Sequence, residues 1–339
     1  MTVMTDDSIP VTSRAVHDEM IAFGIMTVLL LIVPFTGIYP FFVMQALCFA
    51  LLACAFNLLI GYGGLLSFGH AMFLGTGGYV TAHLLKVGAI SLPYWPGLWF
   101  TIPFPPFSPE MAILGGAAAS AVLALITGFI SIRRQGIYFA MITLALSQLL
   151  YFIYLQTPFT HGEDGIQGIP QGYMFGFLNL SNPTILYYVV LAVFLFGFLV
   201  IFRTINSPFG EVLKAIRENE PRAISLGYKT DQYKFLAFIL SGTLAGLAGS
   251  LKVFVAQNAS LTDVEVGMSG LIVLMTLVGG LGTVFGPVVG AFIIVGMQQY
   301  LSGLGQWVTV IQGTVFVVCV LTFRRGIIGE IAHYLRRSL

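Results

Sequence analysis

Few side chains within the apolar stretches of this 339-residue chain could do chemistry. Those that could bind or orient a polar solute are Asn57, Ser67, His70, Thr143 and Gln148. No charged side chain lies near the middle of an apolar stretch, where it would cost about 2.5–3.5 kcal/mol on insertion scales. A carrier driven by protons or sodium is therefore disfavoured. We expect a solute that passes these residues to meet hydrogen-bonding groups and helix ends.

The sequence lacks the residue patterns that catalysis or metal binding requires. It contains no G-x-x-x-x-G-K-[ST] phosphate loop, no H-E-x-x-H and no G-x-S-x-G. Its cysteines, Cys48, Cys54 and Cys319, lie in apolar runs without clustered partners. We expect no enzyme activity, no metal and no cofactor in this chain. His70 has a plainer alternative role, a hydrogen bond to a neighbouring backbone group.

One charged segment, residues 207–234, interrupts the apolar sequence. Ser207 is suited to cap a helix that starts at Pro208, Pro221 allows a break, and Gly227 offers a left-handed stop. The spacing predicts two short helices with apolar residues, Val212 and Ile224 among them, near one face. A membrane-surface helix is the alternative, but anionic lipid favours a purely basic face, so we favour docking on a partner protein. The residues expected to carry the docking are Pro208, Phe209, Gly210, Leu213, Ile216, Arg217, Glu218, Glu220, Ala223 and Gly227.

Composition places the whole chain in a membrane. Hydrophobic residues make up 57% and charged residues 9% of the sequence, whereas soluble domains carry roughly 25% charged residues. The net charge of +1 provides no basic field for nucleic acid. The N-terminus lacks the basic start and cleavage site of a signal peptide, so we expect the first apolar helix to be retained. The predicted class is an all-α polytopic membrane protein.

Ten stretches are candidate membrane spans, given that a crossing takes about 20 apolar residues. They are residues 20–36, 41–60, 66–86, 112–132, 137–156, 183–203, 235–253, 268–285, 287–301 and 307–323, of which 66–86 is glycine-rich and could be broken, and 287–301 is short. Thirteen of the 15 lysines and arginines then fall on one side, which the positive-inside rule assigns to the cytoplasm. We predict a cytoplasmic tail over 1–19, a transmembrane domain over 20–325 with a cytoplasmic loop at 204–234, and a cytoplasmic tail over 326–339.

Small residues predict close helix packing and two interruptions. The pairs Gly242/Gly246 and Gly286/Gly290 follow the small-xxx-small pattern that lets helix backbones approach. Residues 63–71, GGLLSFGHA, resemble residues 279–287, GGLGTVFGP. Paired glycine interruptions point to a transport site between repeats, although chance similarity in a chain with 39 glycines is the alternative.

Several stretches in order carry a family resemblance. They are GYGGLLSFGHAMFLGTGGYV (61–80), RRQGIYFAMITLALSQ (133–148), GEDGIQGIP (162–170), residues 207–251 and GGLGTVFGPVVGA (279–291). Together they resemble the LivM-type permease subunits of branched-chain amino-acid ABC importers. The resemblance implies a permease domain of about ten helices in a bacterial inner membrane.

The resemblance also implies partners and a coupling region. The partners would be a LivH-type permease or a second copy of this chain, two cytoplasmic ATPase subunits that hold the ATP, a periplasmic solute-binding protein and membrane lipid. Residues 208–227 would dock on an ATPase, although Pro221 replaces the first acid of the EAA-x-x-x-G signature and Glu220 sits one place early. Members also move urea, short amides and aromatic carboxylates, so these solutes stay open. A stand-alone channel or secondary carrier is the alternative of another class.

Overall fold

The computed structural model describes residues 11–35, 37, 39–87, 89–95, 98–103, 107–134, 136–305, 307–322 and 326–335. Residues 1–10 of the predicted N-terminal tail and residues 336–339 of the predicted C-terminal tail lie outside the described residues.

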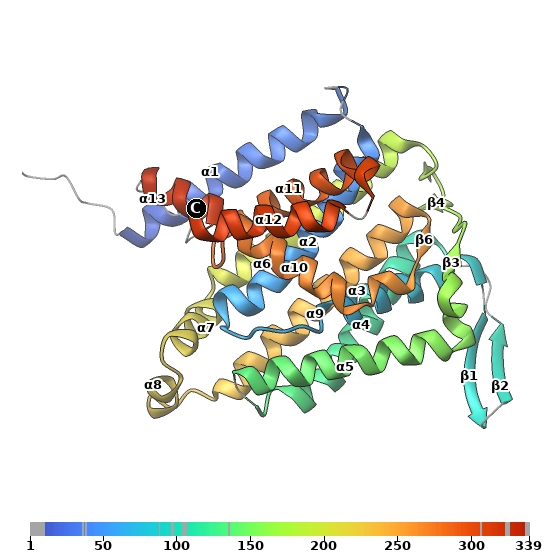
Figure 1. Ribbon diagram of the computed structural model, residues 1–339, viewed down its shortest axis with the longest axis horizontal. Helices are drawn as coiled ribbons and strands as arrows, with labels where there is room; N and C mark the ends of the chain where they lie inside the picture. Colours follow the sequence, from blue (N-terminus) through green and yellow to red (C-terminus); the bar gives the residue numbers. More distant parts are fainter. Residues whose placement is uncertain are drawn as a thin grey trace, which may run out of the picture.

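Helices make up most of the molecule (Figure 1), which confirms the predicted all-α membrane fold. Their bounds are α1 Val11–Ile32, α2 Pro40–Asn57, α3 His70–Ala82, α4 Pro109–Ser131, α5 Ile137–Gln156, α6 Pro183–Ile205, α7 Pro208–Glu218, α8 Glu220–Ser225, α9 Thr230–Ala256, α10 Val266–Gly279, α11 Gly286–Tyr300, α12 Trp307–Thr322 and α13 Gly326–Leu335. A π-helical turn, Leu58–Tyr62, continues α2, and a second one, His83–Val87, continues α3. Short 3-10 turns lie at Val33–Phe35, Pro158–Thr160, Gly162–Asp164, Leu261–Asp263 and Ser302–Leu304.

Short antiparallel strands occupy the connections. β1 (Ala89–Trp95) pairs with β2 (Leu98–Pro103), β3 (Ile166–Gln167) with β6 (Asn258–Ala259), and β4 (Tyr173–Met174) with β5 (Leu178–Asn179). Figure 1 shows β1, β2, β3, β4 and β6 at one end of the molecule and α7 and α8 at the opposite end. The charged segment and the strand-bearing loops are therefore separated by the length of the helices.

Five helices within the described residues are long and apolar enough to cross a membrane: α2 with its π turn, α4, α5, α6 and α9. In two predicted spans the glycine-containing part is not helical, because α3 starts at His70 rather than 66 and α10 ends at Gly279 rather than 285. α10 and α11 have 14 and 15 residues, and α3 has 13 before the five residues of its π turn, so each is shorter than the roughly 20 residues that a crossing takes. The number of complete crossings, ten, stays a prediction.

The core forms around α9, which packs against α2, α3 and α4. On α9, a Cβ at Gly246 would lie 2.1 Å from Ser120 Oγ of α4, and a Cβ at Gly242 would lie 2.7 Å from Ala124 Cβ. On α11, a Cβ at Gly290 would lie 1.8 Å from the Met275 carbonyl oxygen, and one at Gly286 would lie 2.2 Å from Thr283 Oγ1. Each glycine therefore occupies a place where no side chain fits.

Buried ion pairs lie near both ends of α9. Lys234 pairs with Glu220 of α8, and Lys252 pairs with Asp263 on the strand-bearing side. The two lysines are 18 residues apart, which corresponds to roughly 27 Å of α-helix. That length is close to the hydrocarbon thickness of a bilayer, about 30 Å. The charges on α9 therefore bracket an uncharged segment of membrane length.

Candidate functional site

The charged segment folds as two short helices, as its local signals predict. The Ser207 hydroxyl accepts a hydrogen bond from Gly210 N at 3.4 Å, and Gly227 has φ +90° after α8. Between the helices, Asn219 Oδ1 accepts from Arg222 N at 3.1 Å and caps α8. The sequence interpretation missed this cap, although Asn219 stands two places before Pro221, the arrangement typical of a helix start.

The apolar residues of α7 and α8 point in two directions, which corrects the single docking face predicted for them. Leu213, Ile216 and Ala223 are buried within the chain, with exposed fractions of 0%, 3% and 3%. By contrast, Ile224 and Leu226 are 55% and 69% exposed. Helical spacing identified apolar positions, but it could not show that the chain's own bundle covers most of them.

The other predicted docking residues also include both buried and exposed side chains. Gly210 is buried, because a Cβ there would lie 2.1 Å from the Ile205 carbonyl oxygen. Phe209 is half-buried and stacks on Tyr233 with ring centroids 5.5 Å apart. Pro208, Glu218 and Gly227 are exposed, and Glu220 pairs with Lys234. Docking by the exposed members stays a prediction.

Arg217 reaches from α7 to the two glycine-rich segments, although the residue as a whole stays exposed. Its guanidinium Nη1 donates to the carbonyl oxygen of Gly61. Its Cγ lies 3.1 Å from where a Cβ at Gly64 would stand, and its Nη1 lies 3.3 Å from the corresponding position at Gly282. Gly64 and Gly282 have φ values of +68° and +75°, so the backbone conformation favours glycine at both positions.

Asn57 fastens the two segments to each other. Its Nδ2 donates to the Thr283 carbonyl oxygen at 2.8 Å, and its Oδ1 accepts from Gly282 N at 3.0 Å. Asn57 is 2% exposed. We call Asn57, Gly61, Gly64, Gly282 and Thr283 the glycine junction. The structure thus holds the second glycine segment against the end of the helical run that precedes the first one, with both polar atoms of the Asn57 amide bonded to backbone.

The remaining path candidates lie around the start of α3. Thr143 Oγ1 accepts from Phe68 N at 3.2 Å, and Ser67 Oγ accepts from Gly69 N at 3.2 Å. His70 is fully buried, and its Nε2 lies 2.8 Å from Ser241 Oγ, a side-chain partner rather than a backbone one. Gln148 is half-buried on α5. Ser67, His70 and Thr143 hold the extended segment and α3 in place. A role of these three residues and of Gln148 in a solute path stays a prediction.

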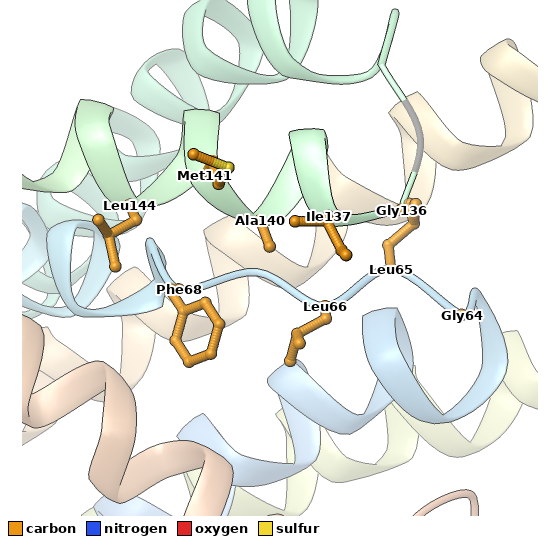
Figure 2. Close-up of a pocket in the computed structure, with 9 residues that line it drawn as sticks. All are labelled: Gly64, Leu65, Leu66, Phe68, Gly136, Ile137, Ala140, Met141 and Leu144. Carbon is orange, nitrogen blue, oxygen red and sulfur yellow. The ribbon is translucent and has the colours of Figure 1, made fainter.

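An apolar groove of about 490 Å³ lies beside that extended segment (Figure 2). Figure 2 shows Ile137 and Ala140 of α5 facing the chain between Gly64 and Phe68. Its lining residues are Gly64, Leu65, Leu66, Phe68, Gly136, Ile137, Ala140, Met141 and Leu144. This volume is in the range of small-molecule sites, roughly 300–1,000 Å³. The sequence interpretation did not single out this groove, because none of its residues is polar.

A second, polar cavity of about 210 Å³ adjoins the groove at Gly64, Leu65 and Gly136, which line both. Its other lining residues are Gly63, Ile216, Arg217, Glu220 and Lys234. The groove therefore leads from apolar surface on α5 to charged groups on α7, α8 and α9. Such a graded lining suits a solute that has both an aliphatic and a charged part.

Comparison with known proteins fits this architecture. Residues 38–321 match the family described as branched-chain amino acid transport system / permease component. The chain belongs to this family. It is a permease subunit of an ABC importer, a multi-pass protein of the inner membrane and not an enzyme, which confirms the resemblance seen in the sequence.

Relatives in the same family are similar over most of the chain. The LivM permease of Salmonella typhimurium is 26% identical over 308 residues, covering 84% of this chain and 68% of the relative. LivM of Escherichia coli is 26% identical over 303 residues, covering 83% and 67%. The L-arabinose permease AraH of Azospirillum brasilense is 27% identical over 225 residues, covering 62% and 63%. No solved structure shows a significant match to the chain.

Proposed function

We propose that this permease subunit forms one half of the membrane pore of a branched-chain amino-acid importer. A LivH-type permease or a second copy of this chain would form the other half, and two ATPase subunits would hold the ATP. The printed function of the LivM relatives supports the solute class. The arrangement of α7 and α8, with one apolar side inward and another outward, is the observation that carries the proposal.

The outward side of α8 is the proposed ATPase contact. Ile224 of α8 is 55% exposed, and Leu226 and Tyr228, just after the helix, are 69% and 43% exposed. The acid Glu218 and the base Arg222 are exposed nearby. A mixed-charge rim around an apolar centre is typical of a protein interface and differs from the purely basic face that anionic lipid selects.

The lining of the groove supports an aliphatic solute. Its nine residues are glycines and apolar residues, which match the side chain of leucine, isoleucine or valine. A sugar such as the arabinose named for one relative would leave hydroxyl groups without partners there, at a cost of about 1–3 kcal/mol for each group. The charged cavity next to the groove could meet the ammonium and carboxylate groups of an amino acid.

The end with the strands is the proposed periplasmic face. β3 pairs with β6 there, and Ile169 N donates to Gln257 O at 3.2 Å, so the loop 162–170 is fixed across the end of α9. A rigid surface of this kind suits a solute-binding protein. The opposite end, with α7 and α8, is then cytoplasmic, and we place both chain termini on that side. α13 supports this placement, since it contacts α10 and α11 near Gly280.

Substitution of the outward residues tests the docking. In the complete transporter, Ile224→Asp with Leu226→Asp should reduce ATPase co-purification by about tenfold or more, because each buried apolar side chain contributes roughly 1.5–3 kcal/mol. Phe177→Asp is the matched control, since Phe177 is 74% exposed between β4 and β5, and β4 lies at the opposite end from α8 (Figure 1). Full co-purification with the doubly substituted subunit would refute the proposed contact.

A further inference from the structure

Arg217 connects α7 to the membrane bundle at a point where the bundle is not regular helix. α7 lies against the bundle through Leu213 and Ile216, and Leu213 Cδ2 is 3.7 Å from the Cβ position of Gly63. Arg217 lies one helical turn after Leu213, on the same side of α7. Its aliphatic stem passes over Gly64, and its guanidinium ends at the Gly61 carbonyl. Movement of α7 is therefore transmitted first to the segment between α2 and α3.

The chemistry of this contact suits a helix end. The backbone N–H groups of residues 63–65 turn back to the carbonyls of Leu59 and Ile60, which precede Gly61. The last carbonyls of a helix lack partners within the helix and carry partial negative charge. A guanidinium has several fixed donors and a permanent positive charge, so it can hold such a carbonyl strongly. Arg217 thus acts on one of the last carbonyls of the helical run Pro40–Tyr62.

The same side chain touches the second glycine segment. Nη1 lies 3.3 Å from the Cβ position of Gly282, and a Cβ at Gly61 would lie 2.8 Å from Gly282 N. Asn57 holds Gly282 and Thr283 by two hydrogen bonds. The segments after α2 and after α10 therefore meet at one arginine, although they are more than 200 residues apart in the sequence.

We propose that Arg217 is a positioning residue that couples α7 to both halves of the glycine junction, so that the two interruptions move together when α7 moves. This inference rests on the proposed docking of α7 and α8 on the ATPase. Arg217 does not contact the ATPase in this scheme, in contrast to its predicted role as a docking residue. When the docking helices are displaced, Arg217 would shift the chain after α2 and the chain after α10, both of which end in the glycine junction.

The number of solute molecules imported per ATP hydrolysed tests the inference. The complete transporter, with its ATPases, second permease and binding protein, is placed in liposomes, and leucine uptake and phosphate release are measured together. Arg217→Ala should lower this ratio by about tenfold, since a hydrogen bond from a charged donor contributes that much to an equilibrium. Arg217→Lys should recover part of the loss, because lysine retains the charge without the fork of donors.

A matched control separates coupling from a general effect of charge. Arg203→Ala removes an exposed cation from the last turn of α6, shortly before α7, and should leave the ratio unchanged. A wild-type ratio in Arg217→Ala would overturn the inference. If that variant fails to assemble with the ATPases, Arg217→Gln is measured instead; a normal ratio there, or failed assembly of both variants, would assign Arg217 a purely structural role. Absence of ATP-driven uptake in the wild type would refute the proposed function itself.

Discussion

Replacement of Gly246 by alanine tests how tightly α9 packs on α4. The new Cβ would lie 2.1 Å from Ser120 Oγ and 2.2 Å from Ser120 Cβ, whereas ordinary contacts begin near 3.4 Å. The helices must separate by about 1 Å, and overpacking of this kind costs typically 1–3 kcal/mol. Alanine also gains about 1 kcal/mol over glycine within a helix. Taking the upper part of the range, we expect a net destabilisation of about 2 kcal/mol.

The sign of the effect should depend on Ser120. In a Ser120→Gly background both clashing atoms are gone, so Gly246→Ala should stabilise the protein by about 1 kcal/mol through helix propensity alone. The assay is unfolding in mixed micelles, followed for all four members of the cycle. Gly270→Ala on α10 is the control, since a Cβ there meets nothing within 4 Å. Equal effects of Gly246→Ala in both backgrounds would refute the close approach of α9 and α4.

Two further predictions concern buried polar groups. Asn57→Leu should destabilise the subunit by about 2–4 kcal/mol in the same unfolding assay, because Gly282 N and Thr283 O each lose a buried partner; wild-type stability would show that this link is unimportant. Lys234→Met should cost about 3 kcal/mol by leaving Glu220 without its partner, and Glu220→Gln in addition should recover much of the loss. A double variant less stable than Lys234→Met alone would contradict the assigned pairing.

Local sequence signals predicted the two short helices of the charged segment. Tertiary contacts determine which of their side chains are buried and which are exposed. Ser207, Pro221 and Gly227 act on their neighbours in the chain, so their effects could be predicted from spacing. The burial of Ile216 could not be predicted in this way. The helical spacing of apolar residues identifies an apolar face, but it does not show whether the same chain or a partner protein covers that face. The groove was missed for a related reason, since its residues resemble ordinary membrane-facing ones.

For the glycine segments, too, the local structure could be predicted from the sequence, whereas the contacts between distant residues could not. Their similarity indicated a pair of interruptions, and the described chain is interrupted between α2 and α3 and between α10 and α11. Asn57 was predicted as a residue of the solute path from its polarity alone. Its two hydrogen bonds to residues 282 and 283 depend on contacts between distant parts of the chain, which sequence spacing cannot supply.

The most direct test of the central claim is leucine uptake into liposomes that contain either this subunit alone or the complete transporter. The subunit is expected to depend on partner ATPases, so uptake against a gradient should require ATP, the ATPase subunits and the binding protein together. Liposomes with this subunit alone should accumulate no leucine. Sustained accumulation by the subunit alone would contradict the account and identify a carrier that works without an ATPase.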